Sequence, residues 1–317
     1  MAEASRQASL GAFCPACGAE LRPWREIPAG EPADPRRFAL LRCRACRSAV
    51  TGGAPPGPEA YESGVYAPGA PRALPLVRAL QRATVAQPVR ILRRAGVRPG
   101  AQVLDVGAGA GRLVEALGRA GYDARGIEPS PRSAAMAAAA GRAVSVEAIG
   151  DHRDQGLDAV VLWHVLEHLD EPRAALAKAR GWLRAGGLLL VGVPNIASLQ
   201  AAVGGAGWLH LDAPRHRVHL TPAGLRALLE DSGFAPGRAH HHVPEHNPAG
   251  MWMAMLARAG MTPGLPFHLL KRNVTARPRD VALMAAGIPL APFAFALEAL
   301  AGLAGHGGTI AVEARRV

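Results

Sequence analysis

The sequence predicts an α/β fold built on a doubly wound parallel sheet with helices on both faces. From residue 101 onward, short apolar runs alternate with helical stretches, which is the pattern of repeated strand–helix–strand units. The apolar runs are continuous rather than alternating, as in strands that are buried on both faces. Because crossovers between parallel strands are right-handed, ligands are expected at the carboxyl ends of the strands.

The expected elements follow one another in a regular order. A helix over 74–96, limited in its continuity by Pro75 and Pro88, precedes the alternating region. Within that region the strands are expected at 101–106, 123–127, 143–147, 157–163 and 187–193, and the helices at 112–121, 131–141 and 172–183. A further helix over 221–233 has Thr221 as its N-cap and Gly233 as its stop. The segment 309–314 is expected to be a final strand.

The chain divides into three regions of different composition. Residues 1–50 hold the four cysteines and are expected to form a small module of their own. Residues 51–73 begin with the Gly/Pro-rich stretch TGGAPPGP, which predicts a linker. Residues 74–317 form the larger domain, in which 236–308 is expected to be a helical insertion before the last strand.

The composition is that of a globular and strongly basic chain. Hydrophobic residues make up 49% and charged residues 19% of the 317 residues, which excludes a disordered chain. The formal net charge is +11, which often indicates a nucleic acid or an anionic surface as partner. The basic residues are nearly all arginines and are scattered rather than clustered. They therefore favour a solvated basic surface over a dedicated nucleic-acid site.

A glycine-rich loop follows the first expected strand and opens the next helix. It spans residues 104–111, LDVGAGAG, with glycines at 107, 109 and 111 that let the backbone turn sharply and approach a ligand. A dinucleotide-binding loop has the spacing G-x-G-x-x-G, whereas this loop has G-x-G-x-G and an acidic residue before the first glycine. It also lacks the Gly-Lys-Ser/Thr ending of a phosphate-binding loop.

This loop resembles the first motif of the class I S-adenosylmethionine-dependent methyltransferases, and GIEPS at 126–130 resembles the second. The resemblance implies a Rossmann-like, seven-stranded sheet and S-adenosylmethionine as cofactor. It implies that Glu128 accepts hydrogen bonds from both ribose hydroxyls, a role that suits a carboxylate because it has two acceptor oxygens. It also implies that an acid at the position of Asp105 helps to hold the methionine end. The expected cofactor-binding residues of the loop are Gly107, Ala108, Gly109 and Gly111.

The adenine ring is expected just after the third strand of the family's sheet. There Ile149 is placed to pack on the ring and Asp151 to accept from the exocyclic amine. An ordinary turn is an equal alternative for these two residues. The same family resemblance extends to Tyr61 and Tyr66, which imply that part of 51–73 folds over the active site as a lid.

Residues 164–168, HVLEH, match the H-x-x-E-H pattern of inverted zinc peptidases. That chemistry needs both histidines on one face of a long helix, but His164 directly follows the apolar strand LDAVVLW. The segment resembles instead the one that lines the cofactor and substrate cleft in this subgroup of methyltransferases. His164 and His168 are therefore expected beside the acceptor.

The segment 208–222 also resembles this subgroup and adds His216 and His219 to the expected acceptor site. A histidine takes a proton from a hydroxyl near neutral pH, which favours methyl transfer to oxygen. The four histidines, His164, His168, His216 and His219, are thus the candidate catalytic residues. A role in holding the loop backbone by hydrogen bonds stays an alternative for His216 and His219.

The cysteines form two C-x-x-C pairs, Cys14 with Cys17 and Cys43 with Cys46. Two such knuckles place four thiolates around one tetrahedral zinc ion. The first 13 residues show no signal-peptide pattern, so a cytoplasmic location is expected, and there paired cysteines favour metal over disulfides. Residues 1–50 are therefore expected to be a zinc-ribbon-like module, structural because four thiolates leave no open position on the ion.

The insertion at 236–308 holds an apolar stretch, 281–304, that is about long enough to span a bilayer. Pro289, Pro292 and Glu298 interrupt it, which favours a helical cap over the substrate cleft. Peripheral contact with a membrane, for a lipid-linked or apolar substrate, is a second hypothesis.

The expected reaction is direct methyl transfer from S-adenosylmethionine to a small-molecule acceptor, such as a sugar, a quinone-like ring, a polyketide or a lipid-linked intermediate. Two alternatives stay open. A zinc ribbon on a basic chain is also similar to some RNA base methyltransferases, for which RNA binding should depend steeply on salt. The second alternative is a binding protein whose methyltransferase domain is inactive.

Overall fold

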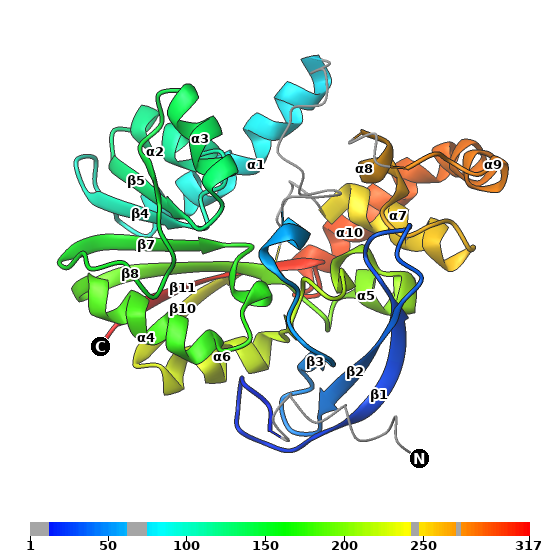
Figure 1. Cartoon of the computed structure of the whole chain (residues 1–317), viewed down its shortest axis with the longest axis horizontal. Helices are drawn as coiled ribbons and strands as arrows, with labels where there is room; N and C mark the ends of the chain where they lie inside the picture. Colours follow the sequence, from blue (N-terminus) through cyan, green and yellow to red (C-terminus); the bar gives the residue numbers. More distant parts are fainter. Residues whose placement is uncertain (1–12, 62–74, 242–246, 271–273) are drawn as a thin grey trace.

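The computed structural model describes residues 13–61, 75–241, 247–270 and 274–317. Its centre is a seven-stranded sheet in the order β10-β11-β8-β7-β4-β5-β6 (Figure 1). The strands are β4 (Gln102–Val106), β5 (Asp123–Glu128), β6 (Val144–Val146), β7 (Leu157–Trp163), β8 (Leu183–Pro194), β10 (Phe234–His240) and β11 (Thr309–Arg316). The first five are parallel, whereas β10 and β11 pair antiparallel. The predicted Rossmann-like, seven-stranded fold class is confirmed.

Helices cover both faces of the sheet (Figure 1). They are α1 (Pro75–Arg94), α2 (Arg112–Arg119), α3 (Pro131–Ala139), α4 (Pro172–Trp182) and α6 (Pro222–Asp231). Successive strand residues point to opposite faces, so α1 and α2 share a core with Val103 and Val161. On the other face α4 and α6 share a core with Leu104 and Val160. This double burial explains the continuous apolar runs.

A second, four-stranded sheet joins the N-terminal residues to a late segment of the chain. Its order is β1-β2-β3-β9, with β1 (Leu21–Pro28), β2 (Arg37–Cys43), β3 (Ala49–Thr51) and β9 (Val218–His219). In the pairing of β3 with β9, Ala49 lies opposite His219 and Val50 opposite Val218. Residues before Thr51 therefore fix the backbone that carries one of the candidate histidines.

The region between β10 and β11 is helical. It contains α7 (Asn247–Arg258), α8 (Leu265–Leu270), α9 (Pro278–Gly287) and α10 (Ala291–Leu303), and α10 packs against α7 (Figure 1). The helix α5 (Leu199–Gly204) also packs against α7. The expectation that 236–308 is helical from its start was wrong for its first residues, which belong to β10. That strand contains Pro236 and Gly237 and has a register shift against β11, so its sequence lacks the pattern of a strand.

The two helices α9 and α10 present apolar side chains to solvent. Pro278–Leu303 is the one stretch in the described part of the chain that is long and apolar enough to cross a membrane, with a mean hydropathy of 1.7. Only 17% of the most apolar part of this stretch is buried. The 3-10 turn Ile288–Leu290 separates the two helices. Phe293 is 60% exposed and Leu303 is 82% exposed, whereas Glu298 of the same helix is buried.

Candidate functional site

The glycine loop connects β4 to α2 and is tied to the neighbouring strand β5. The backbone N–H groups of Gly107 and Ala108 donate to the Ile127 carbonyl at 2.9 and 3.0 Å. Gly107 has a φ of +68°, and a Cβ placed there would lie 2.7 Å from Cγ2 of Val165. Glycine is therefore required at this position by conformation and by space. The contact also brings the loop against the segment HVLEH.

Two of the predicted cofactor acids lie at this loop. One oxygen of the Glu128 carboxylate accepts from the Gly109 N–H at 2.9 Å, and the other accepts from the Ser130 N–H at 2.9 Å. Asp105, near the end of β4, is 4% exposed. Its burial, and secondly the charge of Glu128, raise the pKa of Asp105 to about 8. The two carboxyl groups thus lie beside the loop and close enough for the charge of Glu128 to act on Asp105.

The two residues predicted for adenine lie after β6. Ile149 is half-buried and packs against the core beneath α4 and α6. Asp151 is exposed, in a turn whose Asp151 N–H donates to the Ala148 carbonyl at 3.0 Å. Their contact with an adenine ring stays a prediction.

The segment HVLEH leaves the carboxyl end of β7 as a tight turn rather than a long helix. His164 has a φ of +56°, and only Leu166–His168 form a 3-10 helix. The Nδ1 atom of His164 lies 3.1 Å from Oε1 of Glu167. This geometry places His164 ahead of the helical turn, so the two histidines do not share a face of one helix as in an inverted zinc peptidase.

The structure brings the four candidate histidines together. The Nδ1 atom of His168 donates to the Arg215 carbonyl at 3.2 Å, and Nδ1 of His216 donates to the His210 carbonyl at 2.8 Å. The rings of His168 and His216 are 4.6 Å apart at their centroids. Nε2 of His219, further along the same segment, lies 2.8 Å from Oγ1 of Thr51. These contacts are compatible with both roles predicted for the histidines: proton transfer at the acceptor, and hydrogen bonds that hold the loop backbone.

Of the two tyrosines predicted to belong to a lid over the active site, Tyr61 lies within the described residues. Its hydroxyl donates to the Arg215 carbonyl at 3.3 Å, and its ring lies edge-on to His168 with centroids 5.5 Å apart. Tyr66, the other tyrosine of that prediction, lies outside the described residues.

Burial decides the charge state of the cluster. Burial, and secondly the charge of His216, lower the pKa of His168 to about 4. Burial, and secondly His216, lower the pKa of His219 to about 3. Burial on its own would raise the pKa of Glu167, but the hydrogen bond and charge of His164 outweigh it and lower that pKa to about 2. At neutral pH His168 and His219 are therefore neutral, and Glu167 is ionised.

Sequence reasoning missed the ion pairs that hold the segment 208–221 in place. The guanidinium of Arg215 is almost fully buried and lies 2.7 Å from a carboxylate oxygen of Glu31 and 3.0 Å from one of Asp212. Arg217 is 1% exposed and pairs with Asp170 at 2.7 Å. The alternation of arginine and histidine in PRHRVH was a visible signal, but the partners come from distant parts of the chain.

The cysteine quartet fits one tetrahedral metal ion. The Sγ atoms of Cys14 and Cys46 are 3.7 Å apart, and those of Cys17 and Cys43 are 3.5 Å apart. Four thiolates at ~2.3 Å from a tetrahedral zinc ion stand about 3.8 Å from one another, whereas a disulfide requires ~2.05 Å. All four Sγ atoms lie within 4.8 Å of one another. The residues present therefore match a zinc site and no disulfide.

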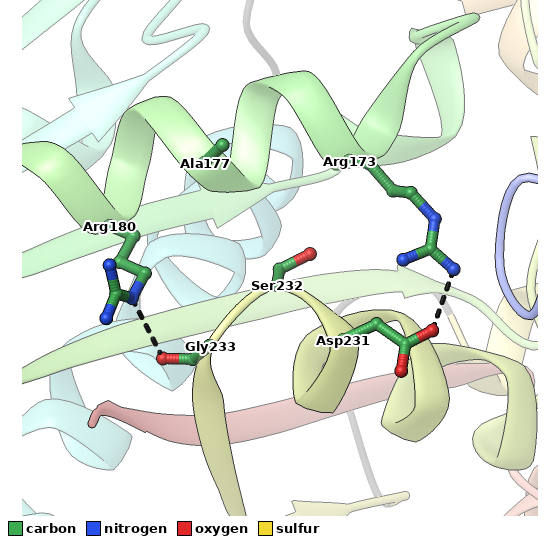
Figure 2. A pocket seen from close by; sticks show the side chains of 6 residues that line it. All are labelled: Arg173, Ala177, Arg180, Asp231, Ser232 and Gly233. Atoms are coloured by element: carbon green, nitrogen blue, oxygen red, sulfur yellow. Dashed lines mark hydrogen bonds and ion pairs between the residues drawn. The ribbon is translucent and has the colours of Figure 1, made fainter.

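A hollow of about 450 Å³ lies between α4 and the end of α6, and Figure 2 shows the residues that line it. An ion pair of 2.8 Å joins Arg173 to Asp231, and Nε of Arg180 donates to the Gly233 carbonyl at 3.2 Å (Figure 2). Its polar groups are thus paired with one another across the two helices. None of the predicted site residues lines it.

Comparison with known proteins agrees with this geometry. A family model described as "Methyltransferase domain" matches residues 78–236, which is half of the chain. The ubiquinone biosynthesis O-methyltransferase of Xanthomonas oryzae pv. oryzae is 32% identical over 148 residues, which cover 42% of this chain and 62% of that protein. The protein of the same name from Xylella fastidiosa is 31% identical over 152 residues, covering 43% and 61%. The chain thus spans about three fifths of the length of these relatives.

Among solved structures, a putative sarcosine dimethylglycine methyltransferase from Galdieria sulphuraria has a TM-score of 0.49 at 16% identity, covering 74% of this chain and 85% of that one. The matched part of the family model runs from α1 through the glycine loop and the histidine cluster to the start of β10. The chain belongs to the methyltransferase-domain family.

Proposed function

We propose that this chain is an S-adenosylmethionine-dependent methyltransferase that acts on an oxygen atom of a small organic acceptor. The observation that carries the proposal is the contact between Gly107 of the glycine loop and Val165 of HVLEH. It puts the expected cofactor loop directly beside the histidine cluster. The names of the sequence relatives, both O-methyltransferases of ubiquinone biosynthesis, support an oxygen acceptor on a small molecule rather than an RNA base.

In this proposal the loop and its acids hold the cofactor, and the histidine cluster faces the acceptor. Glu128 and Asp105 bind the ribose and the methionine end, while Ile149 and Asp151 contact the adenine. The acceptor oxygen attacks the methyl carbon, the S–CH₃ bond breaks with its electron pair remaining on sulfur, and the hydroxyl proton passes by way of the histidine cluster to solvent. The protein contributes mainly position and exclusion of water, which are large effects when two reactants must meet in line.

The first test is a calorimetric titration of the protein with S-adenosylmethionine. Glu128→Ala should weaken binding at least ~10-fold, because two charge-assisted hydrogen bonds of about 1.5–3 kcal/mol each are lost. Glu128→Gln, which keeps one acceptor oxygen, should have an intermediate effect. Asp123→Ala is the matched control, since this exposed acid lies at the opposite end of the same strand; it should bind like the wild type.

Absence of binding to the folded wild-type protein would contradict the cofactor assignment and bring forward the hypothesis of an inactive binding protein. Equal binding by Glu128→Ala and Asp123→Ala would instead contradict the role of Glu128 while leaving the cofactor in place.

We also propose that the cysteine quartet holds a structural zinc ion. The spacing of the Sγ atoms supports it, and four thiolates leave no open coordination position for chemistry.

A third proposal is that α9 and α10 rest on a lipid bilayer. On α10 the acid Glu298 faces inward, where it accepts from the Gly308 N–H at 2.8 Å, while Phe293, Leu300 and Leu303 face outward. This inverts the usual arrangement of an amphipathic helix in water. Arg277 and Arg279 at the start of α9 would meet anionic headgroups.

A further inference from the structure

The histidine cluster contains a buried carboxylate oxygen that no protein group satisfies. Glu167 is 2% exposed, and its Oε1 is engaged by Nδ1 of His164 at 3.1 Å. Among the described residues, Oε2 has no hydrogen-bond partner. A buried ionised group is costly unless it is paired or coordinates a metal ion. The unpaired oxygen therefore points to a ligand of positive charge.

Two imidazole rings next to Glu167 are oriented as metal ligands usually are. In His168 and in His216 the Nδ1–H group donates to a backbone carbonyl, that of Arg215 in one and that of His210 in the other. Histidines that bind metals almost always donate their second ring N–H to such an acceptor, which fixes the tautomer and the ring plane. Nε2 is then the nitrogen that would take the metal in each ring.

The three side chains lie close enough to bind one ion. One atom each from Glu167, His168 and His216 lies within 4.8 Å of the others, and ligands around a single zinc ion stand about 3–4 Å apart, so small side-chain rotations suffice. Two imidazoles and one carboxylate are the ligand set of open zinc and other transition-metal sites.

The backbone around these ligands is held from two sides. The Arg217 N–H donates to the Glu167 carbonyl at 2.7 Å and joins the two segments that carry the ligands. Val165, two residues before Glu167, contacts the glycine loop. A metal ion bound here would thus lie on the acceptor side of the cofactor loop.

We propose that Glu167, His168 and His216 bind a divalent transition-metal ion of the zinc class, and that this ion takes the reacting oxygen of the acceptor as a further ligand. The second half of the proposal rests on the proposed methyltransferase function. The ion lowers the pKa of the hydroxyl as it does that of bound water. The proton passes to solvent, an oxygen lone pair forms the O–CH₃ bond, and the S–CH₃ electron pair stays on sulfur. The acceptor class is therefore a metal-binding oxygen, such as a phenol or an enol.

Zinc content of the full chain tests the site without any need for activity. The protein is saturated with Zn²⁺, desalted and analysed for metal per chain. Glu167→Gln and His216→Asn should each hold one zinc fewer than the wild type, because the cysteine site is untouched. The matched control is His152→Asn, which removes a buried histidine that is paired with Glu147 at 3.0 Å outside the cluster; its zinc content should equal that of the wild type.

Co²⁺ added to protein whose cysteine site already holds zinc gives a second measurement. Weak visible bands of nitrogen and oxygen coordination should appear in the wild type and be absent from Glu167→Gln. Equal zinc content in the wild type and both cluster variants, or no cobalt bands in the wild type, would overturn the site. Circular dichroism checks the fold of each variant, and His216→Asn alone decides if Glu167→Gln does not fold.

Titration of the same samples with S-adenosylmethionine separates this inference from the proposed function. Cofactor binding with no cluster metal overturns only the metal site. A cluster metal with no cofactor binding overturns the proposed function and leaves the metal site standing.

Discussion

Asp105 shows what a single buried carboxyl group does to the molecule. Burial and Glu128 raise its pKa from 3.8 to about 8, so the folded protein keeps a proton that the unfolded chain loses. Stability is therefore unaffected by this group below pH ~4, falls as the pH rises from about 4 to about 8, and is constant above that. The residue thus destabilises the fold at neutral pH, which agrees with the role proposed for Asp105 in holding the cofactor.

We predict that Asp105→Asn is more stable than the wild type at pH 8 by at least about 1 kcal/mol, which is ~2–4 °C in Tm for a domain of this size. The difference should shrink toward zero below pH ~4, where the wild-type group is protonated in both states. Thermal unfolding at several pH values measures it. Asp123→Asn, which removes an exposed acid of β5, is the control for the loss of one negative charge. A stability difference for Asp105→Asn that does not change with pH would contradict the assignment.

At the scale of residues, local motifs were predictable and long-range partners were not. Gly107 and Glu128 could be predicted as cofactor residues because the motifs that contain them, LDVGAGAG and GIEPS, are each one short stretch of sequence. The pairing of Arg215 with Glu31 and of His219 with Thr51 joins segments more than 150 residues apart. Nothing in the sequence specified these partners. The burial of Arg215 and Arg217 therefore could not be predicted from the sequence.

At the scale of elements, hydrogen bonds join the second cysteine knuckle to the start of α6. Oγ1 of Thr221 accepts from the Gly224 N–H at 3.0 Å as the N-cap of α6, and it donates to the Cys46 carbonyl at 2.6 Å. Ser48 adds a hydrogen bond of 3.2 Å from the Thr221 N–H to its Oγ. The second knuckle thus fixes the start of α6 and, through β3, the strand β9 that carries His219.

Removal of the proposed zinc should therefore loosen α6 and β9 specifically. We predict that chelation, or Cys46→Ser, increases amide hydrogen exchange in 218–228 at least ~10-fold, equivalent to about 1.4 kcal/mol, since about two hydrogen bonds of 0.5–1.5 kcal/mol lose their support. Exchange in β4 and β5 should change little. Arg44→Ser, an exposed change between the two cysteines of the same knuckle, is the control. Unchanged exchange in 218–228 after metal removal would contradict the link.

Elements whose burial follows their own sequence pattern were predictable. The strand β7 was expected at 157–163 and is observed there, because LDAVVLW is apolar on both faces. The strand β8 begins at Leu183 rather than at 187, since Leu183 pairs with Leu157 ahead of an irregularity in the ladder. The strand β10 was missed because an edge strand tolerates Pro236 and Gly237 without an apolar pattern.

At the scale of the whole molecule, polar and apolar surfaces are distributed unevenly. The net charge is +11. The helices α9 and α10, which lie to one side of the seven-stranded sheet (Figure 1), carry exposed apolar side chains, among them Phe293 and Leu303. Large exposed apolar patches mark contact sites with proteins or membranes. The combination of an apolar helix pair with arginines at its start favours an anionic bilayer over a neutral partner.

We predict that the protein floats with vesicles of phosphatidylglycerol and phosphatidylcholine in a density gradient. The triple variant Phe293→Ser, Phe295→Ser, Leu303→Ser should bind at least ~10-fold more weakly, because each apolar side chain that enters the bilayer contributes on the order of 1 kcal/mol or more. Binding should also fall with added salt and with the share of phosphatidylglycerol, since exposed charges are screened over ~10 Å at 0.1 M salt. Val146→Ser removes an exposed apolar side chain far from α9 and α10 in the sequence and should float as the wild type does. A wild type that stays at the bottom of the gradient, while the triple variant alone abolishes a concentration-dependent dimer, would show that a second copy of the chain covers these helices instead.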